Sequence, residues 1–151
     1  PSPLTQRIDR IKQILAERRN KYQMEEMPSR VVETAYPPCI KLLSSDLIAK
    51  RHIPHVGRFT LTSFLLTIGV NADALVKLYA STTDFEEKLT QYQVEHIAGM
   101  RGSGTKYTPP NCETLKTHSL CPGEDEICKT IRHPLSYYRK KLRRIKGGAS
   151  A

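Results

Sequence analysis

The sequence contains no apolar run that approaches the ~18 to 20 residues needed to span a bilayer. Its first residues, PSPLTQRIDRIKQ, also lack the apolar core of a signal peptide. The length of 151 residues suits one domain that can bury a core of its own. We therefore expect a soluble intracellular protein with no membrane partner.

The sequence also has almost no strand-like alternation of apolar and polar residues. Apolar residues instead recur at helical spacing, and helices are expected over residues 4–22, 36–51, 57–69, 72–80, 85–99, 111–120 and 133–146. We predict a mainly α fold, a compact helical domain with long loops near its cysteines. The stripe on the first helix consists of Leu4, Ile8, Ile11, Leu15 and Tyr22. Packing on the domain itself is the simplest expectation for that stripe.

Local signals predict several helix ends. Gly69 should stop the third helix, Asn71 should cap the fourth and Asn111 should cap the sixth. Asp84 and Glu87 have the spacing of a capping box for the fifth helix. Apolar periodicity predicts that Ile40, Leu43, Leu47 and Ile48 point inward from the second helix, and that Phe85, Leu89, Tyr92 and His96 form one stripe on the fifth.

Catalytic signatures are missing as well. Phosphoryl transfer by a polymerase needs carboxylates that converge on metal ions ~3.5 to 4 Å apart. The nearest candidate, Asp84-Phe85-Glu86, lies at a predicted helix start, where alternate residues diverge. The string from Gly99 to Lys106 resembles a P-loop but has Thr before Lys and no strand before it. We expect no catalysis within this chain.

Positive charge is concentrated in the last third of the chain. Residues 101–151 hold 11 Lys or Arg and 4 Asp or Glu, and so contribute +7 of the net +9. Such a field favours polyanions such as nucleic acid. A solubilising basic tail at RKKLRRIKGG is the alternative, and the final GGASA is expected to be flexible.

The four cysteines include no C-x-x-C pair. Cys39 is followed after 72 residues by Cys112, after 8 more by Cys121 and after 6 more by Cys128. Structural zinc sites usually build on a C-x-x-C knuckle or a close Cys/His pair, so zinc becomes a minor option. Two disulfides are disfavoured in a reducing interior, and four unrelated buried cysteines remain a further interpretation. One remote ligand is tolerable for an iron–sulfur cluster, which thiolates ligate at four corners.

Five segments carry a resemblance to a known family. They are YPPCIKLL, HIPHVGRFTLTSFLLTIGV, YQVEHIAG, KYTPPNCETLKTHSLC and CKTIRHPLSYYR, in that order between residues 35 and 139. Together they resemble the C-terminal domain of the large subunit of the archaeal and eukaryotic DNA primase, and the short connections look more like the archaeal branch. On this resemblance a helix and linker over residues 1–33 precede the iron–sulfur domain at residues 34–146, and a flexible tail follows at residues 147–151.

The resemblance implies a 4Fe-4S cluster with Cys39, Cys112, Cys121 and Cys128 as its four ligands. It also implies a non-catalytic accessory role in primer initiation. The partners would be template DNA, the initiating nucleotide triphosphate, the RNA primer-template junction and the small catalytic subunit. The N-terminal domain that docks the small subunit in the family is absent here. The expected location is the cytoplasm, or the nucleus in a eukaryote.

Several residues are expected to contact nucleic acid or the triphosphate. His52, His55 and Arg58 lead into a helix whose free amides can face a phosphate, although H-x-x-H could also be a metal pair or two surface histidines. Tyr92 could stack on a base, with core packing as the competing interpretation. The expected contacts also include Lys50, Arg51, Arg101 and Lys106.

Two other functions remain open at this stage. One is a redox or electron-transfer switch, in which the same cluster changes oxidation state. The other is a zinc-bound interaction module with no nucleic-acid role.

Overall fold

The computed structural model describes residues 6–14, 31–82 and 85–149, and every regular element within them is helical. The predicted mainly α fold is therefore confirmed. No helix in this described part of the chain is long and apolar enough to cross a membrane. The chain divides into two compact units, residues 1–30 and 31–151. In the first unit residues 6–14 are helical; Leu4, Leu15 and Tyr22 of the predicted stripe lie outside the described residues.

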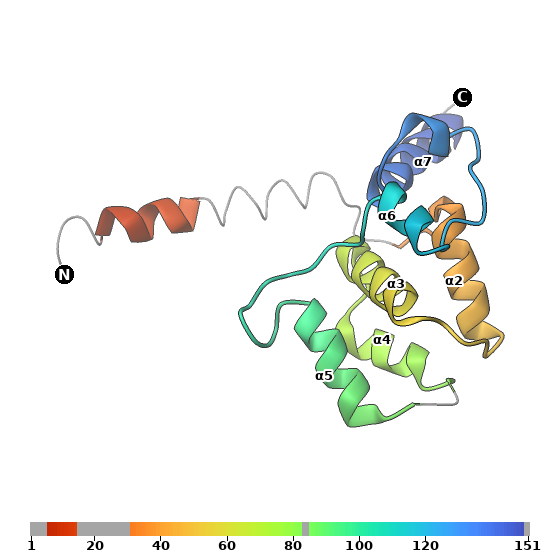
Figure 1. The fold of residues 1–151 in the computed structure, drawn as a ribbon. Coiled ribbons are helices and arrows are strands. Elements are labelled where there is room, and N and C mark those ends of the chain that lie inside the picture. Colours follow the sequence, from red (N-terminus) through yellow and green to blue (C-terminus); the bar gives the residue numbers. More distant parts are fainter. Residues whose placement is uncertain (1–5, 15–30, 83–84, 150–151) are drawn as a thin grey trace. The chain divides into compact units, whose positions relative to one another are not determined.

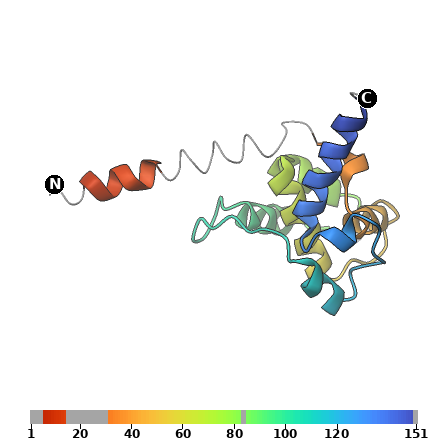
Figure 2. The same cartoon turned by 90° about the horizontal axis from the view of Figure 1, so that it is seen from above.

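Helix α3, His55–Ile68, is the centre of the second unit. It contacts α2, Pro38–Ile48, as well as α4, Ala72–Tyr79, and α5, Glu87–Ile97. Helices α2 and α5 lie on opposite sides of α3 (Figures 1 and 2). This central position explains why α3 carries more buried residues than any other described helix.

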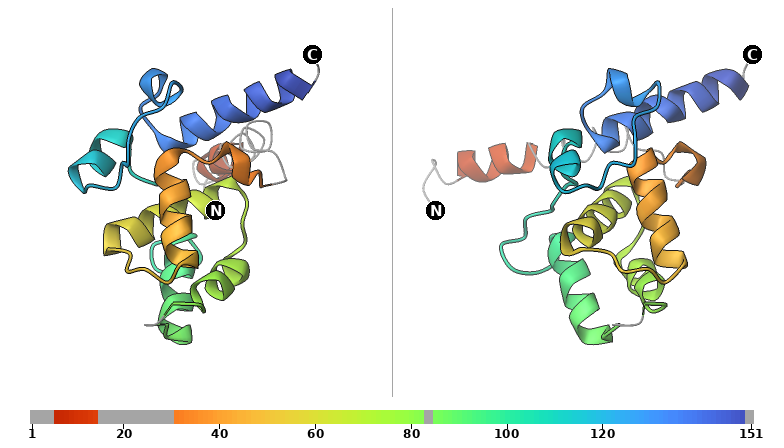
Figure 3. Two further views of the ribbon diagram at one scale, coloured as in Figure 1. Left: turned by 90° about the vertical axis from the view of Figure 1, so that its right-hand side faces the viewer. Right: turned by 45° about the vertical axis from the view of Figure 1, so that its right-hand side comes forward.

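Helix α7, Pro134–Ala149, lies at the end of this unit that is opposite α4 and α5 (Figures 1 and 3). It packs against a 3-10 turn, η1, Glu33–Ala35. Between α5 and α7 the chain is mostly loop, interrupted by α6, Cys112–Thr117, and a second 3-10 turn, η2, Cys128–Thr130. These loops carry three of the four cysteines.

The core of α3 mixes apolar side chains with satisfied hydroxyls. Phe64 is fully buried, and its ring meets that of Tyr138 in α7 edge-on at 5.7 Å between centroids. Thr60 and Ser63 are buried beside it, and each hydroxyl donates to the carbonyl four residues earlier at 2.7 Å. Because these hydroxyls are bonded locally, neither is left as an unsatisfied polar group in the core.

The predicted helix ends are largely confirmed. Gly69 ends α3 in a left-handed conformation with φ +116°. The Asn71 carboxamide oxygen accepts from the Ala74 amide at 2.8 Å, and the Asn111 oxygen accepts from the Thr114 amide at 2.9 Å. These caps place α4 directly after α3 and fix the start of α6.

Several other local predictions are wrong. Ile40, Leu43 and Leu47 are buried as expected, but Ile48 is 74% exposed. The predicted stripe on α5 also fails, because Leu89 and Tyr92 are exposed and the buried positions are Thr90 and Val94. Helix α5 lies at the edge of the unit, so only the narrow face with Thr90 and Val94 is covered. Because Thr90 is polar, the apolar periodicity did not indicate this face.

The predicted capping box on α5 is also wrong. The N-cap is Glu86 with no side-chain bond, so Glu87 is the first helical residue rather than the third; Asp84 lies outside the described residues. At the other end of the chain, α7 continues through Gly147 to Ala149, into the segment assigned to the tail.

Gly69→Ala is expected to lower the free energy of unfolding by about 1–2 kcal/mol, because an L residue is strained at this positive φ. The added methyl itself would meet no atom within 4 Å. Gly147→Ala is the matched control, since it is helical and equally uncrowded, and it should stabilise by up to ~1 kcal/mol. Urea unfolding measures both changes, and effects of the same sign would contradict this account of Gly69.

His133 ties the loop before α6 to the start of α7. Its Nδ1 accepts from the Leu135 amide at 3.1 Å, so Nε2 carries the proton and donates to the Pro109 carbonyl at 2.9 Å. Burial lowers the pKa of His133; the bond to Pro109 opposes this shift and the charge of Arg139 adds to it. The folded chain therefore holds this side chain neutral.

Stability is expected to fall as the pH drops below about 6.5, the ordinary histidine pKa, because the unfolded chain then takes up a proton that folded His133 resists. His133→Gln should flatten the pH dependence of the free energy of unfolding. His118→Gln, at an exposed histidine, should leave it unchanged. Denaturant titrations between pH 5 and 8 compare the three proteins, and equal slopes for wild type and His133→Gln would exclude this role.

Candidate metal centre and phosphate-binding face

The structure brings the four cysteines together around one cavity of about 40 Å³. Cys39 comes from the first turn of α2, Cys112 from the start of α6, Cys121 from the loop after α6 and Cys128 from the start of η2. All four thiols are free, so the disulfide interpretation is not supported. The cavity is larger than the roughly 10–15 Å³ that one water molecule requires.

Proline and capping interactions position these thiols. Pro38 occupies the first turn of α2, where its missing amide proton leaves no bond unmade. The amide of Cys112 donates to the Arg132 carbonyl at 2.9 Å, which joins the start of α6 to the segment before α7. The cysteines are therefore held by local backbone structure as well as by the cavity that they share.

Three of the thiols, those of Cys39, Cys112 and Cys128, are held protonated at neutral pH when no metal is bound. Burial raises the pKa of Cys39 to about 12, and the negative charge of Cys112 adds to this effect. Burial also raises the pKa of Cys128 to about 11 and that of Cys112, where the charge of Cys121 contributes as well. A metal group must therefore displace protons when it binds.

The donor set is four sulfur atoms, which suits zinc or an iron–sulfur cluster. Nowhere among the described residues do three or more His, Cys, Asp or Glu side chains form a group that could hold a metal ion. A zinc ion would need its thiolate ligands at ~2.3 Å. Four thiols around a cavity are compatible with a larger thiolate-ligated group.

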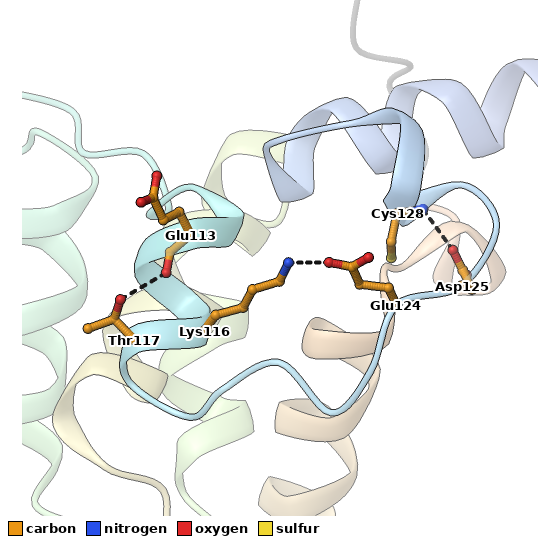
Figure 4. A network of polar contacts seen from close by, with 6 residues as sticks. All are labelled: Glu113, Lys116, Thr117, Glu124, Asp125 and Cys128. Carbon is orange, nitrogen blue, oxygen red and sulfur yellow. Dashed lines mark hydrogen bonds and ion pairs between the residues drawn. The ribbon is translucent and has the colours of Figure 1, made fainter.

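An ion pair crosses the rim of this cavity. Lys116 on α6 reaches Glu124 in the loop that follows Cys121 (Figure 4). Both side chains line the cavity, and the pair lowers the pKa of Glu124 and raises that of Lys116. Exposed pairs of this kind add little stability, so its main effect is to place a cation beside Cys112 and Cys121.

A second site lies around Arg58. Two cavities, of about 230 and 270 Å³, are both lined by Arg58 and Tyr79 and therefore adjoin. The Arg58 guanidinium lies 4.6 Å from the centre of the Tyr79 ring. The Tyr79 hydroxyl lies 2.6 Å from the Thr62 hydroxyl and donates to the Arg58 carbonyl at 3.3 Å. Burial raises the pKa of Tyr79, so this hydroxyl stays protonated.

Most of the predicted binding residues border these two cavities. Lys50, Arg51 and His52 line one of them, and His55 and Tyr92 line the other. The two histidines therefore lie on different cavities, which does not support a metal pair. Lys106 is exposed but lines neither cavity.

Tyr92 belongs to a short stack of rings rather than to the core. It is 51% exposed, and its ring stacks on that of His96, which in turn stacks on Tyr107. The Arg101 guanidinium lies 5.5 Å from the centre of the Tyr92 ring and pairs with Glu95. Nδ1 of His96 is buried and has no hydrogen-bond partner among the described residues, so it is not a satisfied core histidine.

Sequence reasoning missed several members of these sites. Tyr79 looked like one more apolar position on α4, and Tyr107 gave no periodic signal within its loop. Lys116 and Glu124 are eight residues apart and belong to different segments. Only the fold reveals their proximity.

Comparisons with known proteins identify one family that matches most of the chain. Residues 29–146 match the family described as the C-terminal domain of the large subunit of eukaryotic and archaeal DNA primase. The chain is 50% identical over 114 residues to the DNA primase large subunit PriL of Methanocella arvoryzae. The aligned region covers 76% of this chain and 31% of that protein. It is 39% identical over 134 residues to PriL of Methanococcoides burtonii, and this aligned region covers 89% of this chain and 36% of that protein.

PriL of Archaeoglobus fulgidus is 47% identical over 104 residues, 69% of this chain and 27% of that protein. The chain thus spans about a third of the length of these relatives. The matched region includes all four cysteines and the residues around Arg58. The chain belongs to the family of C-terminal domains of the archaeal and eukaryotic DNA primase large subunit.

Proposed function

We propose that this chain is a non-catalytic accessory domain of DNA primase, which binds template DNA, the 5′-triphosphate of the initiating nucleotide and the RNA primer-template junction. The observation that carries the proposal is the gathering of basic side chains around Arg58 in a member of this family. Catalysis would belong to the small subunit. That subunit would be contacted by a part of the large subunit outside this chain.

The start of α3 is suited to bind a phosphate. Its N-cap is Pro54, and no side chain caps the first amides of the helix. These amides and the helix dipole favour an anion at this end. Arg58 borders both cavities, so its guanidinium could share a phosphate with His52 in one cavity or with His55 in the other.

The ring stack offers a second kind of contact. The exposed ring of Tyr92 lies on the cavity that also contains His55 and Arg58. A base or sugar could rest on it while the phosphates meet Arg58, because aromatic rings stack on any base. Arg101 would join this contact once it leaves Glu95.

We also propose that Cys39, Cys112, Cys121 and Cys128 hold a 4Fe-4S cluster. When bound, the cluster would cross-link α2 to the loops between α5 and α7. Zinc is the less favoured occupant, because the four cysteines include no C-x-x-C knuckle of the kind on which structural zinc sites usually build. No specific feature of the described residues favours a redox switch.

Arg58→Ala is expected to weaken binding to a primer-template carrying a 5′-triphosphate by about tenfold or more, because a charge-assisted bond contributes ~1.5–3 kcal/mol. Affinity for the same duplex with a 5′-hydroxyl should change much less. Fluorescence anisotropy at several salt concentrations measures both. Each lost phosphate contact should reduce the slope of log affinity against log salt by about 0.7–0.9.

The matched control is Arg144→Ala, which removes an exposed arginine on α7. It should lower the affinity for the 5′-triphosphate duplex and for the 5′-hydroxyl duplex by the same factor, because it removes only part of the general electrostatic attraction. If Arg58→Ala and Arg144→Ala reduced the preference for the triphosphate by the same factor, the assignment of Arg58 to that group would be wrong.

Cys39→Ser should destabilise the cluster-loaded protein far more than the protein without its metal. In the loaded protein it removes the one ligand supplied by α2, whereas in the metal-free protein it exchanges one buried donor for another. Thermal unfolding of both forms, prepared anaerobically, gives the two shifts in Tm. Equal shifts would show that Cys39 is an ordinary core residue.

A further inference from the structure

Asp125 accepts two hydrogen bonds, one of them from the backbone of a cysteine that lines the cavity. Its Oδ1 accepts from the Cys128 amide at 2.9 Å (Figure 4). Its Oδ2 accepts from the Tyr137 hydroxyl at 2.5 Å. Asp125 therefore connects a cysteine in the loops to the buried face of α7.

Tyr137 is a buried tyrosine of α7 that faces the loop carrying Asp125. It is only 1% exposed. Its pKa is raised first by burial and by the bond to Asp125, and then by the charges of Cys128 and Cys39. The hydroxyl thus remains protonated and donates its hydrogen bond to Asp125.

Besides the bonds of Asp125, the loop that carries it is tied mainly by the exposed ion pair between Glu124 and Lys116. Residues 121–125 form no regular element, and Gly123 has a φ of +152°. Apart from Ile127, its side chains are not fully buried. Hydrogen bonds that a partly buried carboxylate accepts are strong enough to fix the position of such a segment, because breaking them leaves an unsatisfied charged group.

The neighbouring tyrosine makes different contacts. Tyr138 is fully buried, but its hydroxyl accepts from the Val32 amide at 3.2 Å and its ring packs on Phe64. It touches neither Asp125 nor the cysteines in any described contact. The two adjacent tyrosines of α7 therefore differ in their hydrogen-bond partners: the Tyr137 hydroxyl bonds to Asp125, and the Tyr138 hydroxyl bonds to the Val32 amide.

We propose that Asp125 and Tyr137 are positioning residues for the metal centre. Asp125 fixes the backbone of Cys128 so that its sulfur meets the other three, and Tyr137 fixes the carboxylate of Asp125. The inference rests on the proposed cluster and adds to it the outer groups that orient one ligand. Such groups commonly change metal affinity by about 10–100-fold when they are removed.

The test compares Tyr137→Phe with Tyr138→Phe, since each removes one buried hydroxyl from the same helix. Anaerobically loaded protein is mixed with an iron chelator, and iron release is followed by absorbance. Tyr137→Phe should release iron about tenfold or more faster than wild type, whereas Tyr138→Phe should release it at the wild-type rate. Tm values of the loaded proteins show whether general destabilisation explains the difference.

Substitutions at Asp125 add a conservative variant that should retain part of the function, and a measurement that can be made on the metal-free protein. Asp125→Asn keeps an oxygen for the Cys128 amide and should release iron more slowly than Asp125→Ala. In the metal-free protein, hydrogen exchange of the Cys128 amide should accelerate in Asp125→Ala but not in Asp125→Asn. Equal release from Tyr137→Phe and Tyr138→Phe, or unchanged exchange in Asp125→Ala, would overturn this role alone. Absence of a cluster from the wild type would instead overturn the proposed function, and this role with it.

Discussion

The convergence of Cys39 with three cysteines from the far end of the sequence is the constraint on which the second unit depends. Between α5 and α7 the chain has only a six-residue helix and a three-residue turn as regular structure. Few side chains there are buried, among them Leu115, Leu120 and Ile127. Such loops cannot bury enough apolar surface to offset the entropy of ordering them. A group bound by four thiols would supply a cross-link from these loops to α2.

The position of Arg58 depends on a different part of the same scaffold. Helix α3 is anchored by its buried face, and its first turn presents Arg58 above the buried ring of Tyr79. Because Tyr79 is itself held by Thr62, the guanidinium rests on groups that have little freedom to move. A binding side chain supported in this way loses less entropy when its ligand arrives.

In the proposed function the basic residues of α7 would have a more general role than Arg58. This helix carries six lysines and arginines and no acidic residue. It lies at the end of the unit opposite α4 and α5, and so away from the ring stack on α5 (Figure 1). Its charge would attract nucleic acid over a long range without selecting the triphosphate end.

Much of this arrangement was predictable from sequence, because local rules apply to it. Gly69, Asn71 and Asn111 determine helix ends through their own backbone and side-chain bonds, and these predictions are confirmed. The grouping of the four cysteines followed from a family resemblance, since their spacing alone left zinc and other interpretations open.

What the sequence could not reveal depends on contacts between segments. Tyr92 follows a helical apolar pattern, yet it is exposed because its ring stacks on His96 at the edge of the unit. Thr90 is buried although it is polar, so periodicity misplaced the inner face of α5. The bond from Tyr137 to Asp125 joins α7 to a loop, and no local pattern announces it.

The central claim is that four thiolates hold one iron–sulfur cluster, and the most direct test is a metal and sulfide count. Protein purified without oxygen should contain about four irons and four sulfides per chain and absorb near 400 nm, as thiolate-ligated clusters of this type do. One equivalent of zinc with neither iron nor sulfide would contradict the account.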